Sequence, residues 1–421
     1  MIQTNPWAAK AKALDRYRWA LLRERHGLLG SGLRFAREML GDWWFGFRAK
    51  RRLAVTVVPE SCDFLLLQSA PKVIAFQRKK LLIQEMRSRG HNLLESALQA
   101  PSVILSKRQL KQPTCKVPTR YFGLAAHAKW LVDYYQPRIL LNDRNGSFYA
   151  PFLRLALNEK GGILVHLAHA STVEGSRRLG MNDYDYYFLF GQSSLEALQA
   201  RTLRFGCSTA VLSGSHMIDG SYDLEPAEPS LRTVLILGVG PDKEREIGYQ
   251  ATYALLRDWA MNSPEYKVLV KPHPRSDVSF WQQTSRSLSN VEVLPRECSL
   301  AVALSRASVV VNIMSNAVIE AALARRPVLP VNVSGQSDIF EQERFFGECI
   351  VSSKQLQERL TALESDYVSA LQKAVAFSDY HLSQGNKGLE HTIFLLEHLL
   401  HGGDCPGSIL PERGIDKAWK P

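Results

Sequence analysis

The run from Lys267 to Arg275 holds the residue types best suited to binding an anion. Its sequence, Lys-Val-Leu-Val-Lys-Pro-His-Pro-Arg, begins as an apolar strand that ends at Val270. Lys271, His273 and Arg275 follow within five residues, and two prolines stiffen the turn that carries them. Lysine and arginine hold phosphate oxygens as charged donors, and a histidine can hydrogen-bond a phosphate oxygen or help to neutralise a departing nucleoside phosphate. A solvated basic turn is the alternative, but Pro-His-Pro framed by Lys and Arg is unusual for a plain turn, so we expect a phosphate site.

A second candidate follows the apolar run Val309–Ile313, where a small polar turn leads into a helix. We expect Ser315 or Asn316 to cap this helix, whose first backbone N–H groups would form an anion site. Glu320 falls one turn later, where a carboxylate can accept hydrogen bonds from ribose hydroxyls. Simple capping plus a surface glutamate is the alternative. Because parallel strands end at one edge of a sheet, we favour a ligand site shared with the basic turn.

The run Leu-Gly-Val-Gly-Pro-Asp at 237–242 is a weaker candidate of the same kind. Gly238 and Gly240 follow another apolar strand and would let the backbone approach a ligand closely. The run is not a complete G-x-G-x-x-G motif, and a plain turn explains it equally well.

Groups that could take a proton from a hydroxyl occur in the first half of the chain. The run His166–Glu174, His-Leu-Ala-His-Ala-Ser-Thr-Val-Glu, places His169 just past the carboxyl end of a strand, where a neutral imidazole could act as general base. Glu174 could orient His169 or serve as the base itself, and Asp143, after another strand, is a third candidate. A structural histidine is the alternative reading. Because no Asp-x-Asp stands out at a strand end and no His-Glu-x-x-His occurs, no metal-dependent mechanism is expected.

Two successive units of alternating strands and helices must position these residues. Short apolar strands separated by helices predict an α/β chain with two doubly wound, Rossmann-like parallel sheets. In the first unit, residues 53–218, strands are expected at 53–58, 64–68, 73–76, 138–142, 162–166, 186–190 and 209–213. In the second, residues 231–401, they are expected at 233–237, 267–270, 291–294, 309–313 and 328–331, and a helix near 387–400 closes the unit.

The acidic, proline-containing segment 219–230 between these units predicts a hinge, and residues 402–421 a loose tail. Two such domains imply a cleft between them, with ligands bound beyond the carboxyl ends of the strands.

Residues 1–52 form a basic extension ahead of these units. They hold 12 Lys/Arg and 4 Asp/Glu, so 12 − 4 = +8 of the net charge of +11 lies here, together with four of the eight tryptophans. Helices are expected at 8–28 and 33–48. Amphipathic, basic, tryptophan-rich helices are typical of segments that lie on an anionic membrane, whereas a hairpin packed on the first domain is the alternative. Nucleic-acid binding is not expected, because no recognised nucleic-acid module follows.

The sequence favours a cytoplasmic location. It has no run of about 18 apolar residues that would span a membrane and no secretory signal. Its six cysteines are scattered without a C-x-x-C pair, which argues against a zinc site or a disulfide framework and fits a reducing compartment. The basic extension would then place the protein on the inner face of the cytoplasmic membrane.

With these motifs assembled, the chain resembles GT-B enzymes of bacterial surface-polysaccharide synthesis, such as capsule Kdo transferases, polysialyltransferases and CDP-glycerol glycerophosphotransferases. The resemblance covers residues 120–400 and rests on Lys-Pro-His-Pro at 271–274, on Ser315 and Asn316 with Glu320, and on the strand end at 166–174. It implies a metal-independent, inverting transfer from a nucleotide-activated donor, CMP- or UDP-linked, with no further cofactor.

The resemblance also assigns roles to single residues. In such families the histidine of the His-Pro pair contacts the donor phosphate, which matches His273, and the serine of the strand–helix turn binds phosphate too, which matches Ser315. A histidine after a strand of the first domain acts as base in the glycerophosphotransferase group, which matches His169; that group normally has glycine next, whereas Ala170 follows here.

We therefore expect transfer of a sugar to a growing cell-surface polysaccharide or glycolipid. His169 or a nearby carboxylate deprotonates the acceptor hydroxyl, which attacks the anomeric carbon, while Lys271, His273, Arg275 and the Ser315 turn stabilise the leaving phosphate. Polyol-phosphate transfer and 2-epimerisation of a nucleotide sugar are alternatives on the same fold. A non-catalytic partner that tethers a polysaccharide synthesis complex to the membrane is an alternative of another class.

Overall fold

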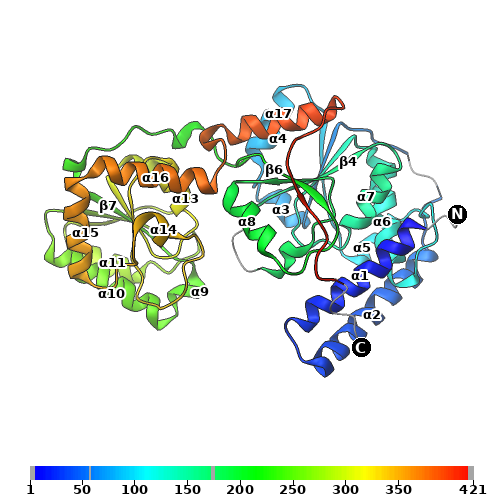
Figure 1. Cartoon of the computed structure of the whole chain (residues 1–421), viewed down its shortest axis with the longest axis horizontal. Helices are drawn as coiled ribbons and strands as arrows, with labels where there is room; N and C mark the ends of the chain where they lie inside the picture. The colour runs from blue at the N-terminus through cyan, green and yellow to red at the C-terminus, as the bar shows by residue number, and fades with distance from the viewer. Residues whose placement is uncertain (1–4, 56–57, 172–175, 416–421) are drawn as a thin grey trace. The chain divides into compact units, whose positions relative to one another are not determined.

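The structure is a computed structural model of the 421-residue chain and describes residues 5–55, 58–171 and 176–415. The chain divides into two units, Met1–Met217 with Gly388–Pro421, and Ile218–Lys387. Each unit has its own β-sheet with helices packed against it (Figure 1). None of the helices in this part of the chain has the length and apolar character that a membrane span needs.

The sheet of the first unit has the order β12-β6-β5-β4-β3-β1-β2. Its strands are β1 (Phe64–Gln68), β2 (Leu93–Ala97), β3 (Ile139–Asn142), β4 (Ile163–Leu167), β5 (Tyr186–Leu189), β6 (Ser208–Leu212) and β12 (Ser408–Leu410). All are parallel except β12, which runs antiparallel to β6. From β1 the chain proceeds to β2 on one side and to β3 on the other, so the carboxyl ends of β1 and β3 flank the topological switch point, where open α/β sheets bind their ligands.

Helices cover the first sheet on both faces. They are α3 (Pro71–Ala75), α4 (Lys80–Ser88), α5 (Pro101–Ser106), α6 (Thr119–Tyr135), α7 (Ala150–Asn158), α8 (Gln192–Ala200) and α17 (Gly388–Leu400). On one face, apolar residues of α4 and α17, such as Met86 and Leu396, form a core with Phe64, Leu141 and Val165 of the strands. Helix α7 packs against β4 and α6.

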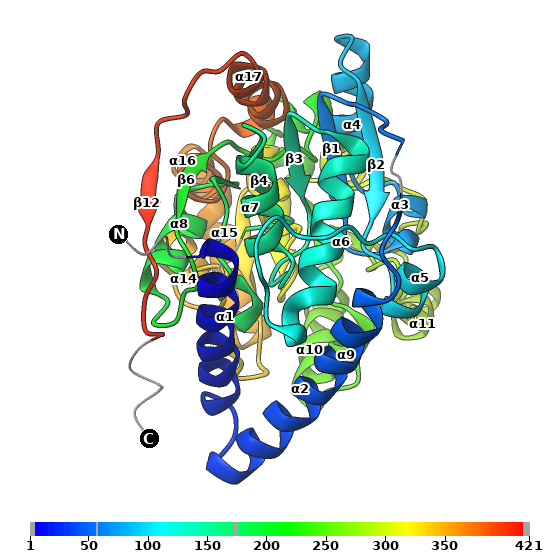
Figure 2. The same cartoon turned by 90° about the vertical axis from the view of Figure 1, so that its right-hand side faces the viewer.

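The basic extension forms a helical hairpin that is part of the first unit (Figure 2). Helix α1 (Pro6–Arg23) begins after Asn5, whose side chain accepts a hydrogen bond from the Ala8 amide, and it buries Trp7, Leu14 and Tyr17. Helix α2 (Leu28–Lys50) packs along α6. The predicted alternative of a packed hairpin thus describes α1, but α2 leaves much of its apolar surface exposed.

Two glycines allow α2 and α6 to approach closely. A Cβ on Gly46 would collide with the carbonyl group of Thr119, and a Cβ on Gly123 would collide with the ring of Phe45. Phe45 and Phe122 belong to the small apolar core of this contact. Because backbone atoms occupy the space at Gly46, no side-chain movement can relieve the clash there.

The sheet of the second unit is entirely parallel, with the order β11-β10-β7-β8-β9. Its strands are β7 (Thr233–Leu237), β8 (Lys267–Lys271), β9 (Val291–Val293), β10 (Val309–Asn312) and β11 (Val328–Pro330). Its helices are α9 (Pro241–Glu244), α10 (Ile247–Asn262), α11 (Ser279–Ser287), α12 (Leu300–Ser305), α13 (Val318–Leu323), α14 (Gln342–Phe346), α15 (Ser353–Ser365) and α16 (Tyr367–His381).

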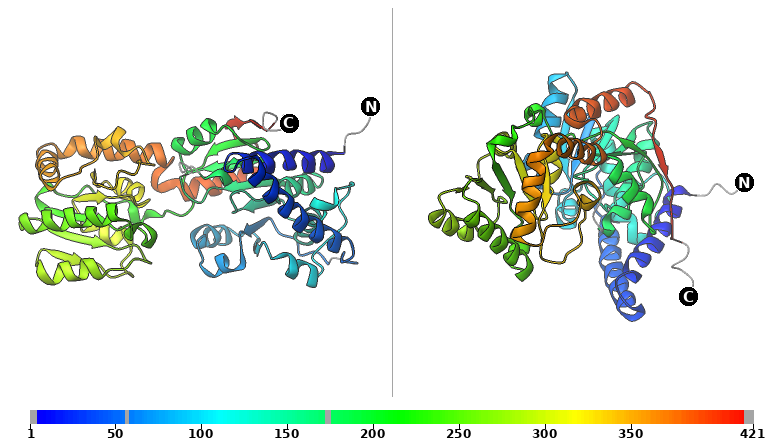
Figure 3. Two further views of the ribbon diagram at one scale, coloured as in Figure 1. Left: turned by 90° about the horizontal axis from the view of Figure 1, so that it is seen from below. Right: turned by 60° about the vertical axis from the view of Figure 1, so that its left-hand side comes forward.

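Alternate strand residues pack one face of this sheet against α10, α11 and α15, with Trp259, Trp281 and Leu360 among the buried partners. The right-handed crossovers place α12 and α13 on the opposite face, so that helices lie on both sides of the strands (Figure 3). Here the switch point lies between β7 and β10.

The structure corrects the predicted assignment of the carboxyl-terminal segments. Helix α17, expected to close the second unit, belongs to the first, where Ile393 and Leu396 are fully buried. Strand β12 then pairs with β6, so the described part of 402–421 is not a loose tail. An apolar helix face fits either sheet equally well, and only the path of the chain decides which sheet it covers.

Some local predictions were also wrong. Residues 73–75 lie in α3, where Pro71 occupies the first turn of a helix, and the described part of 53–58 is irregular. Strand β2 and helix α5 lie where the sequence predicts no regular element. Strand β2 is at the sheet edge, and its middle residues are only partly buried, so it lacks the apolar run of the central strands. The first helix of the extension spans residues 6–23 instead of 8–28. The second spans 28–50 instead of 33–48, because Gly30 and Gly32 lie inside it.

Replacing Gly46 with alanine should destabilise the first unit by about 1–3 kcal/mol, since the added methyl group forces α2 away from α6. Gly41 is a matched control in the same helix, because nothing lies within 4 Å of a Cβ placed there. Gly41→Ala should be neutral or stabilise by up to about 1 kcal/mol. Urea unfolding of both variants tests this, and equal stabilities would contradict the packing described.

Candidate functional site

The carboxyl ends of three neighbouring strands bring the predicted anion-binding residues of the second unit to one edge. Asn312 of β10, Leu237 of β7 and Lys271 of β8 lie opposite one another in register. With neighbouring strands roughly 4.8 Å apart, the backbones of Asn312 and Lys271 are separated by roughly 10 Å. The loops that follow them, with His273 and Ser315, therefore flank the switch point, as the sequence predicts for a shared ligand site.

The turn after β8 holds His273 in one defined tautomer. The backbone N–H of Arg275 donates to Nδ1 of His273 at 3.2 Å, so in the neutral ring Nε2 carries the proton and is the free donor. Partial burial and the charge of Arg275 lower the pKa of His273, although Glu244 opposes them. At neutral pH this side chain is thus a hydrogen-bond donor without charge, and not the third cation of the turn.

Lys271 and Arg275 supply the positive charge of this turn. Lys271 is half-buried and its Nζ donates to the carbonyl oxygen of Arg296 at 3.2 Å, while Arg275 is exposed. Neither has a carboxylate partner within the described ranges. Cations left without a counter-charge beside a histidine donor are what a phosphate group requires.

The two glycines after β7 play different parts. A Cβ on Gly238 would lie 3.2 Å from the His273 amide nitrogen and from Pro272, so this glycine lets the two loops pack together. Its amide donates to the Lys271 carbonyl at 3.0 Å. Gly240 precedes α9, and nothing lies within 4 Å of a Cβ placed there. Gly238 therefore shapes the histidine turn, whereas no contact in the structure requires Gly240.

The turn after β10 differs from the predicted helix cap. Helix α13 begins at Val318, and its N-cap residue is Ala317, without a side-chain hydrogen bond. Asn312 Oδ1 accepts from the Ser315 amide at 3.0 Å, and Ser315 Oγ accepts from the Ala317 amide at 3.3 Å. Ser315 is thus held in the turn before the helix, because two successive side-chain turns replace the cap. Asn316 is exposed beside it.

Glu320 lies in α13, the helix that follows this turn. Its Oε2 atom is buried and has no hydrogen-bond partner among the described residues, and burial raises the pKa of the carboxyl group to about 7. Burial together with the charge of Glu320 raises the pKa of Tyr222 to about 12. A buried carboxylate oxygen without a donor is costly, and a ligand hydroxyl would satisfy it.

In the first unit the structure brings together two of the three proposed bases. Nδ1 of His169 lies 2.8 Å from Oδ1 of Asp143; the histidine side chain is 34% exposed and the aspartate side chain 2%. This is an ion-pair distance, and Asp143 Oδ1 has no aligned hydrogen-bond donor among the described residues. Catalytic hydrogen bonds are often poorly aligned before the substrate binds. Because Asp143 follows β3, the pair stands at the switch point, and Nε2 of His169 has no partner in the part of the chain that the structure describes.

Lys79 and His216 lie behind this pair, and no motif in the sequence indicates a functional role for either residue. Lys79 is fully buried, with its Nζ 3.9 Å from Asp143 Oδ1 and 2.8 Å from Nε2 of His216. Burial lowers the pKa of Lys79, and the charge of Asp143 opposes this. Burial first, and then the charges of Lys79 and His169, hold the pKa of His216 well below its ordinary value. Neutral His216 therefore accepts a hydrogen bond from Lys79, and the lysine charge faces the carboxylate.

His166 supports the loop that carries Asp143. Its Nε2 lies 2.8 Å from Asn145 Oδ1, its Nδ1 lies 2.7 Å from Asn142 Nδ2, and its ring stacks on Tyr184 at 4.4 Å. Burial keeps the pKa of this imidazole well below its ordinary value. His166 is thus a structural histidine. Glu174, the remaining proposed base, lies outside the described residues.

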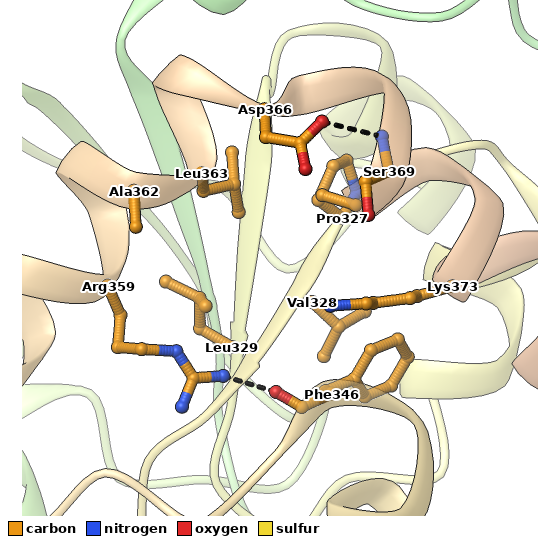
Figure 4. Close-up of a pocket in the computed structure, with 11 residues that line it drawn as sticks. Pro327, Val328, Leu329, Phe346, Arg359, Ala362, Leu363, Asp366, Ser369 and Lys373 are labelled. Atoms are coloured by element: carbon orange, nitrogen blue, oxygen red, sulfur yellow. Dashed lines mark hydrogen bonds between the residues drawn. The ribbon is translucent and has the colours of Figure 1, made fainter.

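A cavity of about 310 Å³ lies elsewhere, beside the edge strand β11 of the second unit (Figure 4). Arg359 on its wall donates to the carbonyl oxygen of Phe346, and Asp366 accepts from the Ser369 amide at 3.3 Å. These polar groups are used within the fold, and none of the predicted site residues lines the cavity.

Solved structures similar to the chain share little of its sequence. The putative UDP-N-acetylglucosamine 2-epimerase from Listeria monocytogenes matches with a TM-score of 0.53 and 10% identity, over 84% of this chain and 99% of that one. Another UDP-N-acetylglucosamine 2-epimerase matches with a TM-score of 0.51 and 12% identity, over 83% and 99%. S. aureus MnaA in complex with UDP matches with a TM-score of 0.50 and 12% identity, over 83% and 99%.

These likenesses, with two parallel α/β units, confirm the predicted GT-B fold. No protein-family model and no curated protein matches the chain.

The buried pair of Lys79 and His216 makes stability depend on pH. The folded pKa of His216 lies below the unfolded value of about 6.5, so only the unfolded chain takes up this proton as the pH falls. The stabilisation is complete above about pH 6.5 and is lost below it, by up to about 1.4 kcal/mol per pH unit. His216→Gln keeps an acceptor for Lys79 and should make the acid limb of urea unfolding shallower by that amount. The exposed His398, replaced by glutamine, is the control; identical acid limbs for wild type and His216→Gln would contradict the assignment.

Proposed function

We propose that the protein is an inverting, metal-independent glycosyltransferase that moves a sugar from a nucleotide-activated donor to a cell-surface polysaccharide or glycolipid. The observation that carries the catalytic part of this proposal is the pairing of the half-exposed His169 imidazole with the buried Asp143 carboxylate. A base oriented in this way by a third group is the arrangement that activates a hydroxyl nucleophile.

The second unit binds the donor in this proposal. Lys271, Arg275 and the Nε2–H of His273 hold the phosphate, which develops negative charge as it leaves. The turn at Ser315 completes the anion site, and the unsatisfied Glu320 carboxylate accepts a ribose hydroxyl. The GT-B neighbours include a structure with bound UDP, which supports a nucleotide ligand; for this chain we propose a CMP- or UDP-linked sugar.

The first unit supplies the base. Nε2 of His169 takes the proton of the acceptor hydroxyl, and the oxygen bonds to the anomeric carbon as the bond from that carbon to the donor phosphate breaks. The charge that the imidazole gains is stabilised by Asp143 at 2.8 Å. Nζ of Lys79 lies behind the carboxylate, 3.9 Å from Asp143 Oδ1.

Epimerisation of a nucleotide sugar at C2 is the second candidate, because solved structures described as UDP-N-acetylglucosamine 2-epimerases have the same fold. The two reactions differ in their need for an acceptor. A protein that equilibrates a nucleotide sugar without any acceptor is an epimerase, whereas a transferase leaves the donor unchanged under that condition.

Helix α2 supports the proposal that the protein works at the inner face of the cytoplasmic membrane. Leu29, Leu33, Leu40 and Trp44 recur at helical spacing and are 85%, 76%, 66% and 57% exposed. The net charge of +8 on residues 1–52 complements anionic headgroups beside this apolar face. Flotation of the full chain with anionic vesicles tests the contact, which Leu33→Glu with Leu40→Glu should abolish.

A nucleotide titration tests the donor site. Thermal-shift measurements with CMP, CDP, UDP, GDP and their sugars should find one nucleotide that raises the melting temperature. His273→Ala and Lys271→Ala should each weaken its binding by roughly tenfold or more, because charge-assisted bonds to phosphate are lost. Lys267→Ala is the control, since this exposed lysine lies at the other end of β8 and pairs with Glu292. No affinity for any nucleotide would refute the proposed donor site.

Product formation with the matching donor and acceptor tests the base. His169→Ala should lower kcat by roughly 10²–10⁴-fold and leave nucleotide affinity unchanged, because the second unit holds the donor. Asp143→Asn should also lower kcat, since the amide does not stabilise the imidazolium ion. His401→Ala, an exposed histidine of the same unit, serves as control. Unchanged turnover of His169→Ala would rule out this residue as the base.

A further inference from the structure

A basic cavity lies in the first unit between the α1–α2 hairpin and the loop that follows β3. Its volume is about 530 Å³, within the range of small-molecule sites. Six arginines line it: Arg18, Arg25, Arg34, Arg144, Arg177 and Arg178. They come from α1, from the turn after it, from α2, from the loop after β3 and from the 3₁₀ turn Arg177–Gly180, so the fold gathers them from five segments.

Few of these charges are neutralised. Arg18 bonds to Asp42 at 2.6 Å and to Glu38 at 2.8 Å, and these are the two acids of the cavity wall. Arg177 pairs with Glu24 at 3.6 Å. The other four arginines have no carboxylate partner in the described part of the chain, and their guanidinium groups remain available to a ligand.

Buried polar atoms on the same wall also lack partners. Tyr17 Oη, Arg18 Nε and Ser147 Oγ are buried without a hydrogen bond among the described residues, and these residues are 1%, 5% and 2% exposed. Each of these groups can donate a hydrogen bond. The cavity therefore combines free cations at its mouth with unsatisfied donors in its wall.

Three of the arginines lie close to His26, a residue of the same cavity. Burial and then the charges of Arg34, Arg25 and Arg177 lower the pKa of His26, which also lines the cavity. Guanidinium groups from the turn between α1 and α2, from α2 and from the 3₁₀ turn therefore lie close enough together to repel a further positive charge.

The cavity and the proposed base share one loop. Asp143, which contacts His169, is followed by Arg144 and Asn145 of the cavity wall, and Asn145 bonds to His166 at 2.8 Å. Gly146, with φ of +71°, packs against Arg178, where a Cβ would lie 2.8 Å from the arginine Cβ. A ligand bound to these arginines is thus held beside the residues that position His169.

We propose that this cavity binds the phosphate or pyrophosphate group of the acceptor, so that the acceptor of the proposed transferase is an anionic, phosphate-bearing molecule. The identification of this ligand as the acceptor rests on the proposed function. Phosphate is favoured over a lone carboxylate because four unpaired guanidinium forks and three buried donors offer more hydrogen bonds than two oxygens accept. The phosphate is carried either by a lipid, which the adjacent apolar face of α2 favours, or by a water-soluble glycan.

Inorganic pyrophosphate is the probe for this site, measured by calorimetry with the full-length chain. Lys271→Ala with His273→Ala serves as background, so that the proposed donor site does not contribute. In that background Arg34→Gln with Arg144→Gln should weaken pyrophosphate binding by roughly ten- to hundredfold. Arg37→Gln with Arg52→Gln removes the same charge from exposed arginines outside the cavity and should have little effect.

Equal losses of pyrophosphate affinity in the test and control variants would overturn the proposal. They would show that pyrophosphate is attracted by the net charge of the protein alone. Arg25→Gln with Arg178→Gln provides a second test pair, to be used if the first lowers the melting temperature. Nucleotide affinity, measured with Lys271 and His273 intact, should be unchanged by either pair. A chain that binds pyrophosphate here but no nucleotide would refute the proposed transferase and leave the cavity assignment standing.

A vesicle arm identifies the carrier of the phosphate. Zwitterionic vesicles with and without an isoprenyl pyrophosphate are compared for binding of wild type and of Arg34→Gln with Arg144→Gln. Retention that requires both the pyrophosphate and the two arginines assigns a lipid carrier. Binding of soluble pyrophosphate through the arginines, without such retention, assigns a water-soluble one. Failure of both probes to depend on the arginines would overturn the proposal.

Discussion

The burial of the Asp143 carboxylate is the constraint on which the candidate site of the first unit depends. A carboxylate that is 2% exposed cannot rely on water, so the fold must supply its counter-charges and donors. Among the described residues, Nζ of Lys79 lies 3.9 Å from Oδ1 of Asp143 and Nδ1 of His169 lies 2.8 Å from it. His216 in turn accepts from Lys79 and stays neutral because it is buried. The half-exposed imidazole is therefore the outermost member of a chain of buried groups that fixes its orientation.

The second unit uses charge in a different way. Its cations at Lys271 and Arg275 are left without carboxylate partners in the described residues, and its histidine is held as a neutral donor by the Arg275 amide. The Oε2 atom of Glu320 is buried without a hydrogen-bond donor among the described residues. Such unsatisfied groups cost stability, and they are tolerated where a ligand provides the missing partner. The first unit thus pairs a half-exposed imidazole with a buried carboxylate, whereas the second unit leaves two cations and a buried carboxyl oxygen without partners among the described residues.

The amino-terminal hairpin joins two roles that its composition alone does not separate. Its buried residues, Trp7 and Tyr17 among them, attach α1 to the first unit, and the close approach of Gly46 to Thr119 fixes the line of α2 along α6. This packing leaves the leucine face of α2 outward and turns Arg18, Arg25 and Arg34 toward the loop after β3. The same basic sequence therefore provides both the exposed apolar face of α2 and one wall of the arginine-lined cavity.

Local sequence patterns predict much of the architecture. The central strands β1, β3, β4, β7 and β10 are apolar runs, which any chain must bury on both sides, and they were predicted within one or two residues. The edge strand β2 was missed because an edge is only half buried. The placement of α17 was wrong because a helix face does not specify its sheet. Which strand lies at the edge of a sheet, and which sheet a helix covers, depend on contacts between segments that are far apart in the sequence.

The site shows the same division. The sequence by itself determined that His273, Ser315, Asp143 and His169 follow strands, and parallel strands must deliver such residues to one edge of a sheet. Only the tertiary structure decided that Asp143 and His169 are partners instead of rival bases, since 26 residues separate them in the chain. Lys79, His216 and the arginine cavity likewise depend on segments distant in sequence. Burial and electrostatic pairing depend on distances in space, and these cannot be read from the separation of residues along the chain.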